Sequence, residues 1–141
     1  MTLAERMTRF TLFGYVASKE TDAVMGAAIG LLGGLAKKIL DTLTFDNGKE
    51  FAKFGQLEQA LGLNVYFAKP YHSWERGTNE NRNGVVRKVL PKGTSFAGLT
   101  DEQIRRVDCL LNDRPMKCLN WRTPREAFAQ LVYRALDVTA A

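Results

Sequence analysis

The sequence has few of the residues that bind zinc or cross-link extracellular proteins. It holds two cysteines, Cys109 and Cys118, without a CxxC spacing, and one histidine among 141 residues. A structural zinc site needs four such ligands, so we exclude one. Two cysteines in a chain of this length are typical of reduced thiols, and we expect a cytoplasmic protein.

Long apolar runs are also missing. The longest one, Ala23 to Ala36, has 14 residues of which four are glycine, whereas a helix that spans a bilayer needs about 20. No positively charged leader with a cleavage site opens the chain. We therefore expect no membrane partner. Neither repeats nor a linker divides the chain, which predicts a single domain over residues 1–141.

Positive charge is present in excess and is unevenly distributed. The chain carries a net charge of +5, and between Lys69 and Arg125 twelve Lys and Arg residues face six Asp and Glu, a net of +6. The remainder therefore carries −1. Because Lys and Arg contacts to phosphate dominate nucleic-acid affinity, this half of the chain favours a polyanionic partner such as DNA.

Hydrophobic patterning and turn residues predict an α/β domain. Short apolar segments indicate strands over 9–16, 40–45 and 64–68, the second of them buried. Helices are expected over 22–32, 50–61 and 79–90, from 100 to 112 and from 123 onward, with caps at Thr21, Thr100 and Thr123 and a stop at Gly62. Glycines at 26 and 30 in the first helix suggest a close approach to a sheet. Strands that alternate with helices, followed by helices alone, indicate an α/β core with a helical C-terminal tail.

Two acidic residues occupy positions suited to catalysis. Asp46 follows a predicted strand at a turn, which is where α/β sheets place ligand groups. It is equally suited to bonding the amides of its own turn. Glu80 lies at the start of a predicted helix, where the macrodipole alone favours an acid. Together the pair would bind Mg²⁺, or Mn²⁺ in its place, because carboxylate oxygens are the ligands that these ions prefer.

Basic and polar residues surround this pair in sequence. Glu80, Gly84 and Arg87 share one helical face, which would set DNA phosphates over the metal ions. The residues that we expect to contact DNA are Lys49, His72, Trp74, Arg76, Asn79, Asn81, Arg87, Lys88 and Lys92. For Arg87 and Lys88 a solvated helix face remains the alternative. For the aromatic loop that holds His72 and Trp74, the alternatives are stacking on bases and burial.

Several sequence words resemble the insertion-sequence 30 family of transposases. They are Leu43–Phe51, Tyr66–Tyr71, Trp74–Gly84, Pro91–Thr94, Leu111–Pro115 and Arg122–Pro124, in that order. Between Asp46 and Glu80 lie 33 residues, the spacing that the family's acidic triad requires. The resemblance implies a ribonuclease H-like integrase core, with Asp46 as the second acid and Glu80 as the third.

The resemblance also implies a part of the core that lies before residue 1. The first acid of the family belongs on an opening strand upstream of the Leu3–Phe10 word, and the chain begins inside that word. We therefore expect a core lacking its first strand and most of its second. Glu5 falls in a hairpin turn of the family pattern and is not expected to replace the missing Asp.

The function expected from these observations is two-metal DNA cleavage and strand transfer during transposition, by a catalytic-core fragment inactive on its own. The alternative is a non-catalytic remnant that binds DNA or dimerises, and so interferes with a complete transposase. In either case DNA is the expected partner. A homo-oligomer is also expected, because exposed sheet edges recruit partner strands.

Overall fold

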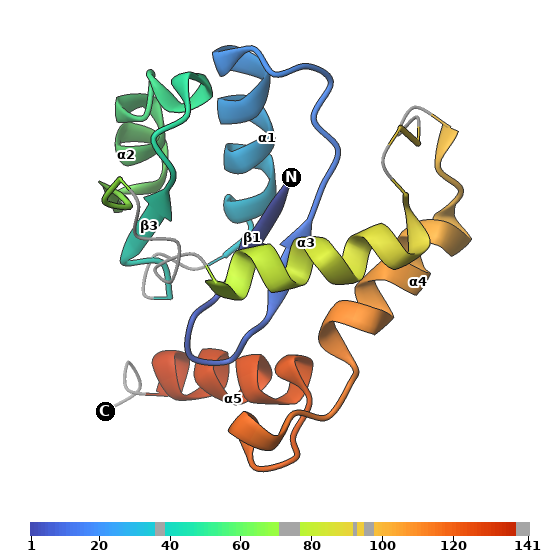
Figure 1. The fold of residues 1–141 in the computed structure, drawn as a ribbon. Coiled ribbons are helices and arrows are strands. Elements are labelled where there is room, and N and C mark those ends of the chain that lie inside the picture. The colour runs from blue at the N-terminus through green and yellow to red at the C-terminus, as the bar shows by residue number, and fades with distance from the viewer. Residues whose placement is uncertain (36–38, 71–76, 92, 95–97, 138–141) are drawn as a thin grey trace. The chain divides into compact units, whose positions relative to one another are not determined.

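The computed structural model describes residues 1–35, 39–70, 77–91, 93–94 and 98–137 (Figure 1). It shows a mixed α/β structure that forms two compact units. Unit 1 comprises Met1 and Gly14–Arg76, and unit 2 comprises Thr2–Phe13 and Gly77–Ala141. In the described part of the chain, no helix has the length and apolarity needed to cross a membrane. The expectation of a single domain stays a prediction.

Unit 1 contains two helices and a parallel strand pair. Its elements are α1 (Thr21–Leu32), β3 (Thr42–Phe45), the 3-10 turn η1 (Lys49–Phe51), α2 (Gly55–Leu61) and β4 (Asn64–Phe67). β3 and β4 pair in parallel, from Thr42 beside Asn64 to Phe45 beside Phe67. Met25 and Ala28 of α1 are fully buried, as is Leu57 of α2, and α1 packs on α2. The helices therefore provide most of the core of this unit.

Two of the predicted elements in unit 1 are corrected by the structure. The strand expected over 40–45 exists as β3, but only Phe45 in it is buried, and Thr42 and Thr44 are exposed. The helix expected from Glu50 begins at Gly55, because the chain first makes the η1 turn that stacks Phe51 on Phe45 with ring centroids 4.1 Å apart. The predicted stop at Gly62 is confirmed.

The prediction for α1 was right in extent and wrong in two details. The helix spans Thr21–Leu32, but Glu20 occupies the cap position and no side chain caps the helix. Gly26 and Gly30 are both exposed, and a Cβ built on either one meets nothing within 4 Å among the described residues. Close approach to a sheet therefore does not explain these glycines.

Unit 2 joins a short hairpin to three helices. Its elements are β1 (Thr2–Ala4), β2 (Thr11–Phe13), α3 (Gly77–Val89), α4 (Asp101–Asn112), the 3-10 turn η4 (Lys117–Leu119) and α5 (Pro124–Asp137). β1 and β2 are antiparallel. The strand predicted over 9–16 shortens to β2 because Arg9 has a φ of 63° and ends the turn. Figure 1 shows α3 crossing α4, and four buried side chains fill that contact: Val86, Leu90, Val107 and Leu111.

The predicted caps in unit 2 are confirmed. Thr100 and Gln103 form a reciprocal capping box at the start of α4. At the start of α5, the Thr123 hydroxyl accepts the Glu126 N–H at 3.1 Å, and the Glu126 carboxylate accepts the Thr123 N–H at 2.8 Å. The bond from the Thr123 N–H lowers the pKa of Glu126 below its ordinary value. These pairs satisfy donors that a helix start leaves without partners.

Asn112, at the end of α4, completes the backbone pairing of β2. Its side-chain oxygen accepts the Thr11 N–H and its amide nitrogen donates to the Thr11 carbonyl, both at 2.9 Å. Asn112 is 0% exposed and Thr11 is 1% exposed. One side chain therefore provides the donor and the acceptor that a neighbouring strand would otherwise offer to β2.

Asn112→Ala is expected to destabilise unit 2 by about 3 kcal/mol, because each buried backbone group left without a partner costs roughly 1–3 kcal/mol. Chemical denaturation of the variant and the unaltered chain measures the difference in the free energy of unfolding. Asn81→Ala on the exposed side of α3 is the matched control and should change it by less than about 0.5 kcal/mol. Equal effects of the two substitutions would show that the Asn112 bonds contribute nothing.

Candidate catalytic and DNA-binding residues

Asp46 lies directly beyond the carboxyl end of β3, in unit 1. The Ala68 N–H donates to the Phe45 carbonyl at 2.8 Å, and the Asn47 side chain donates to the Ala68 carbonyl at 2.8 Å. These two bonds hold the ends of β3 and β4 together around the half-buried Asp46. The predicted position of Asp46 at a strand end is therefore confirmed, at the edge where parallel strands present ligand groups.

Lys49, a predicted DNA contact, follows Asp46 by three positions in the chain. Lys49 opens the η1 turn and is exposed. The stacked rings of Phe45 and Phe51 fix the two ends of the segment between them. A short, anchored loop therefore holds the Asp46 carboxylate and the Lys49 amine within three residues of each other in the chain.

Glu80 lies in the first turn of α3, in unit 2, and is exposed. Glu80, Gly84 and Arg87, which were predicted to share one helical face, are all exposed, as is Lys88, while Val86 is buried. This exposure fits both DNA contact and the solvated face that was the alternative for Arg87 and Lys88. Asn81 is also exposed. The helix α3 thus exposes one carboxylate near its start and two cationic side chains near its end.

Asn79 has a packing role in addition to its predicted one. The Thr2 hydroxyl lies 3.0 Å from Asn79 Oδ1 and 2.6 Å from Asn83 Oδ1, and its single proton serves one of them at a time. These contacts attach β1 to α3, whose first turn holds Glu80. The predicted contact of Asn79 with DNA stays a prediction.

Arg82 is a residue whose role the sequence did not reveal. It is 6% exposed, and its guanidinium donates to the Leu111 carbonyl at 3.2 Å and to the Arg9 carbonyl at 2.9 Å. Burial lowers its pKa below the ordinary value. Arg82 therefore joins α3, α4 and the hairpin turn, and it does not belong to the surface charge available for DNA. Its place between two asparagines in a polar stretch gave no signal of burial.

Glu5 also has a structural role. It lies in the turn between β1 and β2, and its carboxylate accepts the Met7 N–H at 2.8 Å and the Thr8 N–H at 2.6 Å. The prediction that Glu5 falls in a hairpin turn is confirmed. A carboxylate that closes its own turn in this way has little capacity left for a metal ion.

Several predicted residues lie outside the described part of the chain. They are His72, Trp74, Arg76 and Lys92. Asp46 and Glu80 belong to different units, and their convergence on one metal site stays a prediction. Within the ranges that the structure describes, no three His, Cys, Asp or Glu side chains form a group that would hold a metal ion.

Comparison with known proteins gives a consistent result. The chain is 42% identical over 132 residues to the transposase for insertion sequence element IS4351 of Bacteroides fragilis, a match that covers 94% of the chain. It is 37% identical over 135 residues to the IS1086 transposase of Cupriavidus metallidurans, and 36% identical over 125 residues to the transposase InsI for IS30A of Escherichia coli strain K12.

The matches cover less than half of each relative. The chain spans 40%, 40% and 33% of the three relatives, and no family model matches it. The resemblance that the sequence words indicated is confirmed: over about nine-tenths of its length, the chain is related to insertion-sequence transposases of the IS30 kind.

Proposed function

We propose that this chain forms part of the catalytic core of a DNA transposase, in which Asp46 and Glu80 bind divalent metal ions for DNA cleavage and strand transfer. The observation that carries the proposal is the match to a transposase, which is 42% identical and extends over 94% of the chain. Its support within the fold is the position of Asp46 at the carboxyl end of a parallel strand and of Glu80 on an exposed helix start.

The fold that we propose for the complete core is ribonuclease H-like. An antiparallel hairpin and a parallel strand pair separated by a helix, followed by helices alone, are consistent with it. Within the described residues each sheet has two strands, so its outer edges can pair with further strands except where Asn112 bonds Thr11 of β2. Homo-oligomerisation is therefore part of the proposal.

The donor set fits Mg²⁺ or Mn²⁺. Asp46 and Glu80 provide carboxylate oxygens, the hard ligands that these ions select, and neither residue is fully buried. When bound, two such ions activate a nucleophile and stabilise the leaving oxygen of a phosphodiester. The residues of the chain would bind the ions and hold the DNA: Lys49, Arg87 and Lys88 are exposed cations available for phosphates.

A second function has specific support. A protein that binds DNA without cutting it needs exposed cations, and Lys49, Arg87 and Lys88 provide them. Such a protein would compete with a complete transposase for DNA or for a partner subunit. We propose accordingly that the 141 residues by themselves are inactive in strand transfer.

DNA binding by the chain is expected to be electrostatic and weakly selective for sequence. Removal of one phosphate contact should reduce the magnitude of the log–log salt slope on duplex DNA by roughly 0.9. Arg87→Gln and Lys88→Gln should each show this change in titrations of short duplexes at several salt concentrations. Lys53→Gln is the matched control, because Lys53 is already paired with Asp22 at 2.7 Å. A flat salt dependence, or a strong preference for one sequence, would contradict the prediction.

A further inference from the structure

The surface of α5 carries a groove that the proposed catalytic residues do not use. A pocket of about 510 Å³ is lined by Arg122, Ala129, Gln130, Tyr133 and Arg134. A second pocket of about 250 Å³ also includes Arg122, Gln130 and Arg134, and extends to Met7 and Leu119. Because three residues line both pockets, we treat the two as one groove, the α5 groove.

The groove lies on the side of α5 that faces away from the α4 end. On the other side, Phe128 stacks on Phe10 with ring centroids 4.4 Å apart, and Arg125 bonds Asp108 and Asp113 of the α4 end. At 100° per residue, the groove residues lie at other angles around the helix axis than Phe128 and Arg125. These residues are Ala129, Gln130, Tyr133 and Arg134. The helix is therefore anchored along one side and leaves the groove side accessible.

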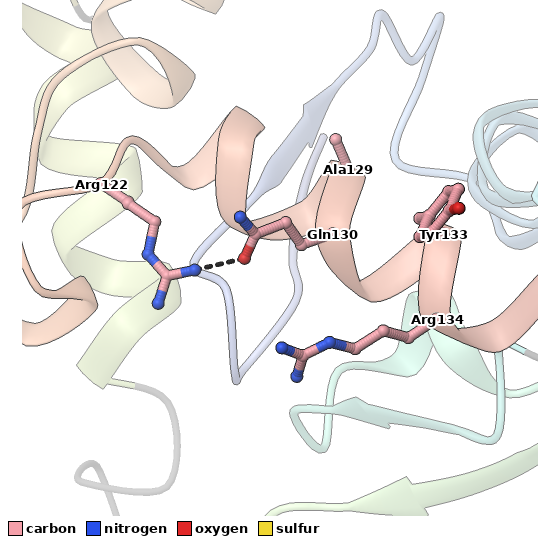
Figure 2. Close-up of a pocket in the computed structure, with 5 residues that line it drawn as sticks. All are labelled: Arg122, Ala129, Gln130, Tyr133 and Arg134. Atoms are coloured by element: carbon pink, nitrogen blue, oxygen red, sulfur yellow. Dashed lines mark hydrogen bonds between the residues drawn. The ribbon is translucent and has the colours of Figure 1, made fainter. Parts of the chain in front are cut away.

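Two guanidinium groups give the groove its charge. Arg122 donates to the side-chain oxygen of Gln130, which holds its guanidinium over α5, and Figure 2 shows Arg134 extending beneath Gln130 toward Arg122. Of the described residues that line the two pockets, none is acidic. Glu126, one turn from Gln130, has its carboxylate bonded to the Thr123 N–H. The groove is thus complementary to an anion.

An exposed aromatic side chain accompanies these cations. Tyr133 lines the larger pocket and is 67% exposed. Figure 2 shows its ring projecting from α5, the helix that also carries Ala129. Trp121, next to Arg122 in the chain, is 71% exposed, and it and Asn120 have φ values of 63° and 55°. Asn120 ends η4 in the left-handed region, as Asn commonly does, whereas Trp121 is strained there, and strain of this kind is concentrated at functional sites.

We propose that the α5 groove binds unpaired DNA, with Arg122 and Arg134 at the phosphates and a base stacked on Tyr133. Cationic side chains that line a groove together with an exposed aromatic ring are the pattern by which proteins hold single strands. A volume of about 510 Å³ lies within the range of small-ligand sites, roughly 300–1,000 Å³, which accommodates a nucleotide. The inference rests on the proposed function, since it assumes that DNA is the partner.

The charge component is tested with the variant Arg122→Gln/Arg134→Gln of the whole 141-residue chain. Removing two phosphate contacts on a single strand should reduce the magnitude of the salt slope by about 1.4 and weaken binding of an oligothymidine about tenfold at roughly 0.15 M salt. The matched control is Arg105→Gln/Arg106→Gln, which removes two exposed cations from α4. An equal reduction in both double variants would show that only net charge matters and would overturn the proposal.

The stacking component is tested at Tyr133. Tyr133→Leu removes the ring and should weaken single-strand binding by roughly tenfold, the scale of one base–aromatic stack. Tyr133→Phe keeps the ring and should bind within about twofold of the unchanged chain. Neither change should alter the thermal unfolding midpoint, because the side chain is mostly exposed. Equal binding by the Leu and Phe variants overturns the stacking contact.

The outcomes separate this inference from the proposed function. If the unchanged chain shows no salt-dependent DNA binding, the proposed function fails and the inference fails with it. If the chain binds DNA and the groove variants bind as it does, the inference alone is wrong. Retention of duplex binding by Tyr133→Leu, together with weakened single-strand binding, is the expected result.

Discussion

Asp46→Asn is expected to lower Mg²⁺-dependent strand transfer by roughly 10²–10³ or more when the chain stands within a complete transposase, because loss of one electrostatic stabiliser from a transfer site costs about that factor. Asn keeps the size of the side chain and removes the negative charge that would hold a metal ion. The bond from Asn47 to Ala68 braces the chain beyond β3, so the variant should keep its fold, which circular dichroism checks.

A chimera provides the test. The chain would replace the matched 132 residues in the Bacteroides fragilis relative, to which it is 42% identical. Glu80→Gln should lower the rate by a similar factor. The double variant should be little slower than either single one, because residues that act as a unit are not additive. Asp101→Asn, an exposed acid at the start of α4, is the control and should leave the rate unchanged.

A second measurement keeps this prediction testable if the parent chimera proves inactive. Calorimetric titration of the unaltered 141-residue chain with Mn²⁺ should show binding that Asp46→Asn weakens and Asp101→Asn does not. Equal Mn²⁺ affinity of these variants, or full strand transfer by the Asp46→Asn chimera, would remove Asp46 from the metal site.

Local signals in the sequence predicted three helix ends correctly, although the cap expected at Thr21 was wrong. Thr100 with Gln103, Thr123 with Glu126, and Gly62 all act as expected, because capping depends on residues within one turn of each other. Such signals need no knowledge of the tertiary structure.

Predictions that depended on tertiary contacts were less accurate. The helix expected from Glu50 starts late because Phe51 stacks on Phe45, a contact that hydrophobic periodicity does not show. Ile104 fits the apolar spacing of α4 and is nevertheless 41% exposed. Nothing in the sequence around Asn112 indicated its bonds to Thr11, because Thr11 lies 101 positions earlier.

The charge count overestimates the cations available for DNA. Arg82 is buried against two carbonyls, and Arg125 is engaged by Asp108 and Asp113. The bond from Arg125 holds the pKa of Asp113 below its ordinary value. The count also ends at Arg125 and so misses Arg134 in the last helix. A net charge from sequence favours one type of partner, while side-chain contacts show which cations are accessible on the surface.

The 141-residue chain by itself is expected to show no useful rate of strand transfer. Two Mg²⁺ ions bring a charge of about +4 to a two-metal site, and Asp46 with Glu80 supplies about −2. The resemblance implies a third acid in addition to these two. Glu5 has its carboxylate bonded within its own turn. A second ion should therefore bind weakly, and without it the nucleophile and the leaving oxygen are not stabilised together.

A strand-transfer assay with pre-cleaved ends in Mg²⁺ or Mn²⁺ measures this, with the unaltered chimera run beside the chain. We expect the chain to be slower than the chimera by more than roughly 10³, because a ligand shared by both ions contributes more than one ordinary stabiliser. Activity in the chain that disappears with Asp46→Asn would contradict the prediction. Asp41, which is exposed just before β3, would then be the first acidic residue to substitute. It precedes the strand that ends at Asp46, and its carboxylate would be the candidate for the third metal ligand.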